Sequence, residues 1–203
     1  SDLGSSGCDN IMSFDTTNFK TKFACELKNY NVSDFFDRKE ARKIDRFAQY
    51  AIVSAEEAII DSGLVFEKED CDRIGVIWGA GIGGLETIEE NAIILKEKGP
   101  RKISPFFVPG SIINMISGNL SIRFGLKGPN IAVTTACTTG THNIGLASNM
   151  ILNNQADIML VGGAEMAASP VGLGGFCAAR ALSTRNEDPE SASRPWDAQR
   201  DGF

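Results

Sequence analysis

Apolar residues recur along the chain with two different periods, which predicts an alternation of helices and strands. Between Asp37 and Gly63 the apolar positions lie three or four residues apart, as on the buried face of one helix. They are Ala41, Ile44, Ala48, Ala51, Ala55 and Ala58. Asp37 is expected to cap this long helix, with Glu40 completing a capping box, and Gly63 is expected to end it. Residues 1–33 have no such period and are expected to be loop-like.

Shorter apolar runs after this helix predict the remaining elements. Strands are expected over 73–78, 131–135 and 157–161, helices over 84–98, 111–123 and 139–153, and a proline- and glycine-containing loop over 99–110. This order of helices and strands predicts an α/β layer with a largely parallel sheet.

One segment of the chain carries no formal charge, from Gly128 to Ala156. Charged side chains are rarely buried without a partner, so a charge-free segment indicates the interior. It is therefore predicted to hold the central strand and the central helix. Its threonines, asparagines and glycines make it too polar for lipid, and no apolar run is long enough to span a membrane.

Composition excludes several classes of function. A net charge of −6 argues against general nucleic-acid binding, which depends on a positive field. The five cysteines are Cys8, Cys25, Cys71, Cys137 and Cys177. They form no C-x-x-C motif, and the chain has a single histidine, so no metal site is expected. Free thiols suit a reducing cytoplasm.

Cys137 lies between a predicted strand and the predicted helix 139–153. The N-terminus of a helix favours an anion, and the thiolate is the form of cysteine that attacks a thioester. The small residues Ala136 and Gly140 leave room for a substrate, and the helix N–H groups could stabilise an oxyanion. Because free cysteines are often buried, position alone leaves open that Cys137 is a small core residue.

His142 and the glycines Gly79, Gly81 and Gly84 invite functional interpretations that the pattern does not support. His142 is five residues beyond Cys137, about 140° around a helix, so it is expected to be a buried structural histidine. The glycines match a dinucleotide-binding fingerprint, but no strand ending in an acidic residue follows about twenty positions later. They are instead expected to let the backbone pass close to the active-site floor.

Positive charge is concentrated in the first turns of the predicted long helix. Lys39, Arg42, Lys43 and Arg46 have the spacing of a single helix face. Such a face is either simply solvated or, in an otherwise acidic chain, steers an acidic partner.

Several segments together resemble one family. The segment 134–145, with Cys137, resembles the active-site segment of β-ketoacyl-acyl-carrier-protein synthase II, an elongating condensing enzyme of the thiolase superfamily. Further matching segments, in family order, are 79–85, 100–109, 162–165, 174–176, 179–185 and 193–197. They cover nearly the whole chain.

The resemblance implies a thiolase-like layered αβαβα fold, of which residues 1–203 form mainly the N-terminal half. It implies that Cys137 takes an acyl group from acyl carrier protein (ACP), and that malonyl-ACP is then decarboxylated and condensed with it. The family's two catalytic histidines and its lysine lie in the C-terminal half, and its first strand would precede Ser1. Truncation at both ends is therefore expected, and an inactive fragment remains an alternative.

The resemblance also implies roles for particular residues. Ile82, Phe107, Ala136 and Phe176 are expected to line the acyl pocket, with Phe107 reaching the pocket of the partner in a homodimer. The expected docking residues for ACP are Lys39, Arg42, Lys43 and Arg180. No cofactor is implied, since the phosphopantetheine arm belongs to ACP. A polyketide ketosynthase remains an alternative, whereas the silent chain-length-factor subunits lack the cysteine.

Overall fold

The computed structural model describes residues 4–203, which form two compact units. Asn31–Met166 form one unit, and the residues up to Tyr30 form the other together with Ala167–Phe203. The parallel sheet and Cys137 belong to the unit Asn31–Met166, called the sheet unit below. The other is called the hairpin unit, because it holds a two-stranded antiparallel pair.

The sheet unit is built on three parallel strands in the order β4-β3-β5. They are β3 (Ile74–Gly79), β4 (Asn130–Ile131) and β5 (Ile158–Gly163). β3 pairs with β5 along its whole length, whereas β4 pairs over only two residues. All six residues of β3 are buried, so β3 is the central strand of the described sheet.

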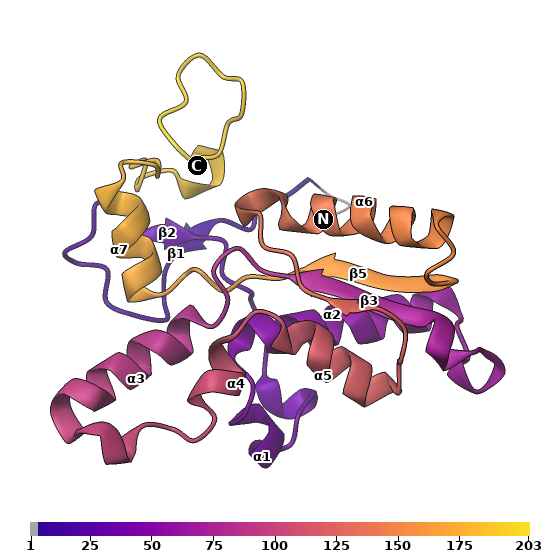
Figure 1. The fold of residues 1–203 in the computed structure, drawn as a ribbon. Coiled ribbons are helices and arrows are strands. Elements are labelled where there is room, and N and C mark those ends of the chain that lie inside the picture. The colour runs from indigo at the N-terminus through magenta and orange to yellow at the C-terminus, as the bar shows by residue number, and fades with distance from the viewer. Residues whose placement is uncertain (1–3) are drawn as a thin grey trace. The chain divides into compact units, whose positions relative to one another are not determined.

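Helices cover both faces of this sheet (Figure 1). α6 (Thr139–Leu152) lies on one face, and α2 (Arg46–Ser62) and α5 (Met115–Phe124) lie on the other. The α/β class with a parallel sheet is therefore confirmed. The remaining helices of this unit are α1 (Arg38–Ala41), α3 (Leu85–Lys98) and α4 (Phe107–Ser111). Short 3₁₀ turns cover Val32–Asp34, Phe66–Lys68, Cys71–Arg73, Pro100–Lys102 and Ala136–Thr138.

The hydrophobic core lies between the sheet and the pair α2 and α5. Alternate residues of β3, namely Ile74, Val76 and Trp78, point into it, as the two-residue period of a strand requires. Phe47 and Ile116 meet them from α2 and α5, and both are fully buried. On the other face of β3 the small residues of the strand admit α6 and the segment that precedes it.

The predicted helix from Asp37 to Gly63 is wrong in one respect, because it is two helices. α1 ends at Ala41, and α2 begins at Arg46 with Asp45 as its N-cap. Asp37 caps α1 as predicted, accepting from the N–H groups of Lys39 and Glu40 at 2.7 and 2.9 Å. The Glu40 carboxylate instead accepts from Arg123 at 2.8 Å, so the predicted capping box does not form.

Two further boundaries differ from the prediction. The helix expected over 111–123 begins only at Met115, as α5, and the loop expected over 99–110 instead ends in the short helix α4. The strand expected over 131–135 is paired only at Asn130–Ile131, at the edge of the sheet. The helices expected over 84–98 and 139–153 and the strands expected over 73–78 and 157–161 agree with α3, α6, β3 and β5 to within two residues.

The prediction that residues 128–156 lie in the interior is wrong for the described chain. Only one narrow stripe of α6, formed by Thr139, Asn143 and Ala147, is buried against the sheet. Several apolar side chains on its other sides are open to solvent; Ile144, Leu146, Ile151 and Leu152 are 42–81% exposed. The absence of charged residues therefore indicates an apolar surface on α6, and no other part of the described chain covers that surface.

The hairpin unit contains β1 (Asp9–Asn10) and β2 (Phe23–Ala24), which pair antiparallel. It also contains α7 (Pro170–Ala178) and a 3₁₀ turn at Pro189–Ser191. Asn186 binds the chain near β2, since its amide donates to the Lys20 carbonyl and accepts from the Lys22 N–H, both at 2.9 Å. None of the helices in residues 4–203 has the length and apolar character needed to cross a membrane.

Replacing Asp45 by alanine should lower the free energy of unfolding by about 2 kcal/mol. The buried Asp45 carboxylate caps α2 through the Phe47 N–H and also accepts from the Thr87 N–H of α3 at 2.9 Å. Asp45→Asn keeps only one of the two acceptor oxygens and should lose about half as much. Urea denaturation of both variants measures the difference, and equal losses would contradict a role for these two hydrogen bonds.

Candidate active site

The C-terminal ends of β3 and β5 lie at the same edge of the sheet, because the strands are parallel. The segment after β4 reaches this edge and turns through Ala136–Thr138 into α6. Cys137 lies in that turn, is exposed, and directly precedes the N-terminal end of a 14-residue helix. The N–H groups at such a helix end have no partner within the helix and can donate to an oxyanion that forms beside the thiol.

Glycines allow unusually close packing of backbone at this edge. A β-carbon at Gly79 would overlap the carbonyl oxygen of Val133, and one at Gly81 would lie 3.4 Å from Cα of Ala136. A β-carbon at Gly163 would lie 3.2 Å from the backbone nitrogen of Gly140. The prediction that Gly79 and Gly81 allow a close backbone approach is therefore confirmed. Substitution at these positions would push the cysteine turn away from the sheet.

The turn that carries Cys137 is held by its own threonines. Thr139 Oγ1 donates to the Ala136 carbonyl at 2.7 Å and accepts from the Thr135 N–H at 3.0 Å. Thr138 Oγ1 donates to the Thr135 carbonyl at 2.9 Å. Ala136 has φ of +53°, a conformation that costs energy for any residue with a β-carbon. The hydrogen bonds on both sides of Ala136 stabilise this conformation and fix the position of Cys137.

His142 is exposed, so the prediction that it is buried is wrong. Its Nδ1 lies 2.8 Å from Oγ1 of Thr135, at the start of the cysteine turn. The ring therefore contacts the chain before Cys137 and has a structural hydrogen bond at the helix surface.

Glu165 follows β5 and holds the glycine loop that follows β3. One carboxylate oxygen accepts from the Ile82 N–H at 2.6 Å, and the other accepts from the Gly83 N–H at 3.2 Å. A β-carbon at Gly81 would lie 2.9 Å from this carboxylate. Glu165 was not among the residues predicted for the site, although an acidic residue two positions after the end of a strand was a signal for a role.

The residues predicted to line the acyl pocket are only partly brought together. Ile82 and Ala136 lie on the two segments that meet at Gly81, and both are exposed there. Phe107 begins α4, whose last residue, Ser111, accepts a hydrogen bond from the Gly84 N–H at 3.1 Å. Phe176 belongs to α7 in the hairpin unit, where its ring packs edge-on against Phe203 at 5.3 Å.

The predicted docking lysines and arginine do not share a helix face, because the chain leaves the helix between Ala41 and Arg46. Lys39 and Lys43 nevertheless line the same cavity of about 450 Å³. Phe106, Pro109 and Met115 supply its apolar wall. Asp37 and Glu40 line this cavity as well, so the two lysines lie beside two carboxylates; Asp37 caps α1, and Glu40 is paired with Arg123. Arg180 is exposed after α7, in the hairpin unit.

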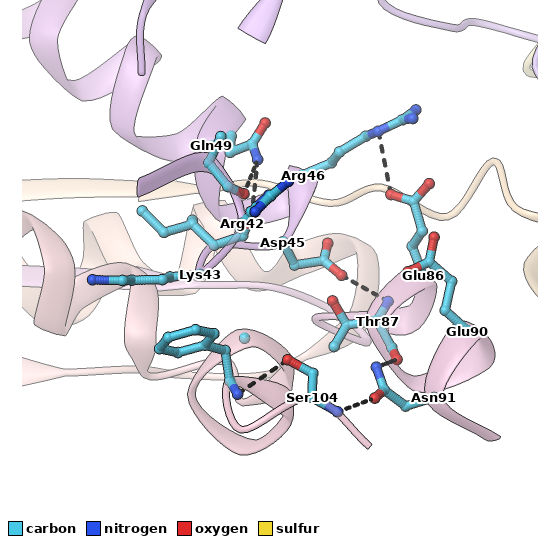
Figure 2. Close-up of a pocket in the computed structure, with 14 residues that line it drawn as sticks. Arg42, Lys43, Asp45, Arg46, Gln49, Glu86, Thr87, Glu90, Asn91 and Ser104 are labelled. Atoms are coloured by element: carbon cyan, nitrogen blue, oxygen red, sulfur yellow. Dashed lines mark hydrogen bonds and ion pairs between the residues drawn. The ribbon is translucent and has the colours of Figure 1, made fainter. Parts of the chain in front are cut away.

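A second cavity, of about 250 Å³, adjoins Arg42 and Lys43 (Figure 2). Its wall is a polar network in which Arg46 pairs with Glu86 at 3.3 Å and Asp45 accepts from Thr87. Burial raises the pKa of Glu86 above its ordinary value, although Arg46 opposes the shift. The Arg46 charge is thus already paired, which leaves Lys39, Arg42 and Lys43 as the charges that an approaching partner would meet.

Within residues 4–203, no group of three or more histidine, cysteine, aspartate or glutamate side chains is placed to hold a metal ion.

These features define an α/β protein whose candidate site is a cysteine at the N-terminus of a helix. The family model described as "Beta-ketoacyl synthase, N-terminal domain" matches residues 10–203. The chain belongs to the β-ketoacyl synthase family, as the sequence resemblance indicates. The 3-oxoacyl-[acyl-carrier-protein] synthase 2 of Vibrio cholerae is 58% identical over 200 residues, which are 98% of this chain and 48% of that relative.

Solved structures agree with this assignment. A β-ketoacyl synthase from Burkholderia phymatum STM815 matches with a TM-score of 0.84 and 28% identity, over 99% of this chain and 50% of that one. A type II PKS ketosynthase solved in complex with its acyl-carrier protein matches with a TM-score of 0.70 and 27% identity, over 77% of this chain and 46% of that one. The thiolase-like fold is thereby confirmed. The chain spans about half the length of the relatives it matches.

Replacing Glu165 by alanine should free the glycine loop next to the cysteine turn. Amide hydrogen exchange at Ile82 and Gly83 should become about tenfold faster, because each N–H loses its acceptor. Glu165→Gln keeps one acceptor oxygen, so the exchange rate at one of the two amides should stay close to that of the parent protein. Glu97→Ala, at an exposed position of α3, is the control and should leave both rates unchanged. Unchanged exchange in Glu165→Ala would contradict the positioning role.

Proposed function

We propose that this chain is the N-terminal half of a β-ketoacyl-ACP synthase that elongates fatty acyl chains, with Cys137 as its nucleophile. The observation that carries the proposal is the exposed thiol held at the start of α6 by the threonines of its turn. A nucleophile in such a place is stabilised as an anion and remains open to a substrate.

The reaction has two steps. The Cys137 thiolate attacks the thioester carbonyl of acyl-ACP, and the phosphopantetheine thiol of ACP leaves as the acyl-enzyme forms. Malonyl-ACP then loses carbon dioxide, and the electron pair of the broken bond attacks the acyl-enzyme carbonyl. The Cys137 thiolate leaves, and β-ketoacyl-ACP is released. The groups that promote decarboxylation belong, in this proposal, to the C-terminal half, which the relatives have beyond the region matched here.

Fatty-acid elongation is favoured over polyketide synthesis by the degree of similarity. Relatives named 3-oxoacyl-[acyl-carrier-protein] synthase 2 are 50–58% identical to this chain. The matched PKS ketosynthase is 27% identical. Chemistry at Cys137 would be the same in both classes, so the acyl group accepted by the enzyme is the difference between them.

Two exposed surfaces of the sheet unit support a larger assembly. The apolar outer face of α6 is suited to packing against the second half of the proposed layered fold. β4 is an edge strand with an exposed Ile131, and edge strands can pair with another chain. We assign β4 and the segment after it to the proposed homodimer interface. We also propose that the enzyme is cytoplasmic, because free thiols suit a reducing compartment.

The acyl pocket in this proposal begins beside Cys137. Ile82 and Ala136 are exposed next to the thiol, where an apolar chain would bury them. Phe107 on α4 and Phe176 on α7 are assigned to the same pocket by resemblance to the family. The Glu165 carboxylate would then set the position of Ile82 through its backbone N–H.

Cys137→Ala should abolish acylation of the enzyme. The test incubates the full natural chain that contains these residues with acyl-ACP and measures its intact mass. A gain of one acyl group is expected in the parent protein and in the control Cys177→Ala, and no gain is expected in Cys137→Ala. An unacylated parent protein, or an acylated Cys137→Ala variant, would refute the proposed nucleophile.

The proposed docking surface consists of Lys39, Arg42 and Lys43. Lys39 and Lys43 line the cavity of about 450 Å³, and Arg42 lines the cavity of about 250 Å³ together with Lys43. Its positive charge stands out in a chain with a net charge of −6, and it suits an acidic partner such as ACP. The matched PKS ketosynthase was solved with its own acyl-carrier protein, which supports a carrier protein as the partner. By resemblance, Arg180 is assigned to the same partner.

The double variant Arg42→Glu, Lys43→Glu should weaken ACP binding by about tenfold at low salt, because two attractions become repulsions. The dependence of Kd on salt concentration should also become shallower. Lys96→Glu, Lys98→Glu makes the same charge change on exposed positions of α3 and is the control. Fluorescence titration with labelled ACP measures both, and equal effects of the two variants would show that only net charge matters.

A further inference from the structure

Two cysteines outside the candidate site face each other at the end of the small hairpin. β1 and β2 pair Asp9 with Ala24 and Asn10 with Phe23. Continuing this register by one position places Cys8 opposite Cys25. Neither residue has a part in the chemistry proposed for Cys137.

The hydrogen-bond pattern of the hairpin defines the kind of pair that Cys8 and Cys25 form. The Ile11 N–H donates to the Lys22 carbonyl at 2.9 Å, which makes Ile11 and Lys22 a hydrogen-bonded pair. Hydrogen-bonded and non-hydrogen-bonded pairs alternate along an antiparallel ladder, so Cys8 and Cys25 occupy a non-hydrogen-bonded position. Residues in such pairs have Cα atoms about 4.5 Å apart, within the range of about 4.4–6.8 Å that a disulfide spans.

The two thiols also interact directly. Burial, and after it the neighbouring Cys25 thiol, raises the pKa of Cys8 to about 11. Both cysteines are free thiols; Cys8 is half-buried and Cys25 is exposed.

Polar contacts between the same two segments hold the pair in place. The Lys28 ammonium lies 3.0 Å from the Asp9 carboxylate. The Glu26 carboxylate, from the residue that follows Cys25, accepts from the Met12 N–H at 3.0 Å and from the Ser13 hydroxyl. The pair is therefore part of a defined hairpin end, and its two sulfurs need no large backbone movement to meet.

We propose that Cys8 and Cys25 form a redox-sensitive dithiol site, which a low-molecular-weight disulfide such as oxidised glutathione converts to an internal disulfide. The exposed Cys25 thiolate attacks one sulfur of oxidised glutathione and releases one glutathione. The Cys8 thiolate then attacks the Cys25 sulfur of this mixed disulfide and releases the second glutathione. The protein loses two electrons and two protons, and glutathione gains them.

The proposed bond would constrain a segment that matters for the hairpin unit. The closed loop runs from Cys8 to Cys25 and includes Thr21, whose buried hydroxyl donates to the Ser183 carbonyl at 2.7 Å. It also includes Lys20 and Lys22, whose backbones bind Asn186. Oxidation would therefore restrain the strands that hold the segment 183–186, without involving the thiol of Cys137.

Peptide mapping tests the site directly. The full natural chain, in its native state, is equilibrated in glutathione buffers, its free thiols are alkylated, and it is digested with trypsin without reduction. Cleavage after Lys20, Lys22 and Lys28 separates the two cysteines, so an internal disulfide joins the Phe23–Lys28 peptide to the peptide that ends at Lys20. Because one oxidised glutathione yields two reduced ones, the linked fraction should follow [GSSG]/[GSH]², whereas a mixed disulfide follows [GSSG]/[GSH].

Single variants complete the test. In Cys8→Ser the linked peptide should disappear, and glutathione should remain on the Phe23–Lys28 peptide. Cys177→Ser, which removes another half-buried thiol of the same unit, should leave the linked fraction unchanged. If the parent protein yields only separate glutathione adducts or unmodified thiols across the buffer series, the proposal is overturned. This result does not depend on whether Cys137 is acylated.

Discussion

The structure of the candidate site depends on backbone passing close to backbone at one edge of the sheet. The end of β3 contacts the segment after β4 where Gly79 meets Val133, and no side chain has room between them. This contact brings the cysteine turn onto the sheet, and Glu165 fixes the adjoining loop from the end of β5. Three segments that are distant in sequence are thereby combined into one site, and the thiol itself contributes nothing to that assembly. Positioning and chemistry are thus supplied by different residues.

Periodicity was sufficient to predict the elements whose ends coincide with a change of pattern. β3, β5, α3 and α6 were found in this way, and so was the α/β class. The break between α1 and α2 could not be found, because the apolar spacing of Ala41, Ile44 and Ala48 runs through it without interruption. The break is held by a local hydrogen bond, in which Gln49 donates to the Ile44 carbonyl, and by a tertiary one, in which Asp45 accepts from α3. The strand expected over 131–135 was placed correctly but predicted too long, since pairing with β3 ends after two residues.

For the site, the sequence indicated the proposed nucleophile better than the residues that hold its surroundings. Cys137 was predicted from its place between a strand and a helix, and the close backbone approach was predicted from the spacing of the glycines. His142 was misjudged because helical geometry gives its direction relative to Cys137, but gives no information on whether another element covers it. Glu165 was overlooked because its contacts join residues more than 80 positions apart along the chain, a relation that spacing cannot reveal. For the segment 128–156, the absence of charge indicated an apolar surface, but it gave no information on whether another part of the protein covers that surface.

The positive φ of Ala136 has a consequence for how such an enzyme could change its selectivity. Only glycine relieves the strain at this position, and asparagine or aspartate tolerates it best among other residues, whereas valine, isoleucine and the aromatic residues are strongly disfavoured. Larger apolar side chains are therefore disfavoured at 136 by the backbone itself. Ile82 and Phe107 do not have a positive φ and carry no such restriction. In the proposed enzyme, changes to the acyl pocket would consequently fall on Ile82 or Phe107, while the residue next to the proposed nucleophile stays small.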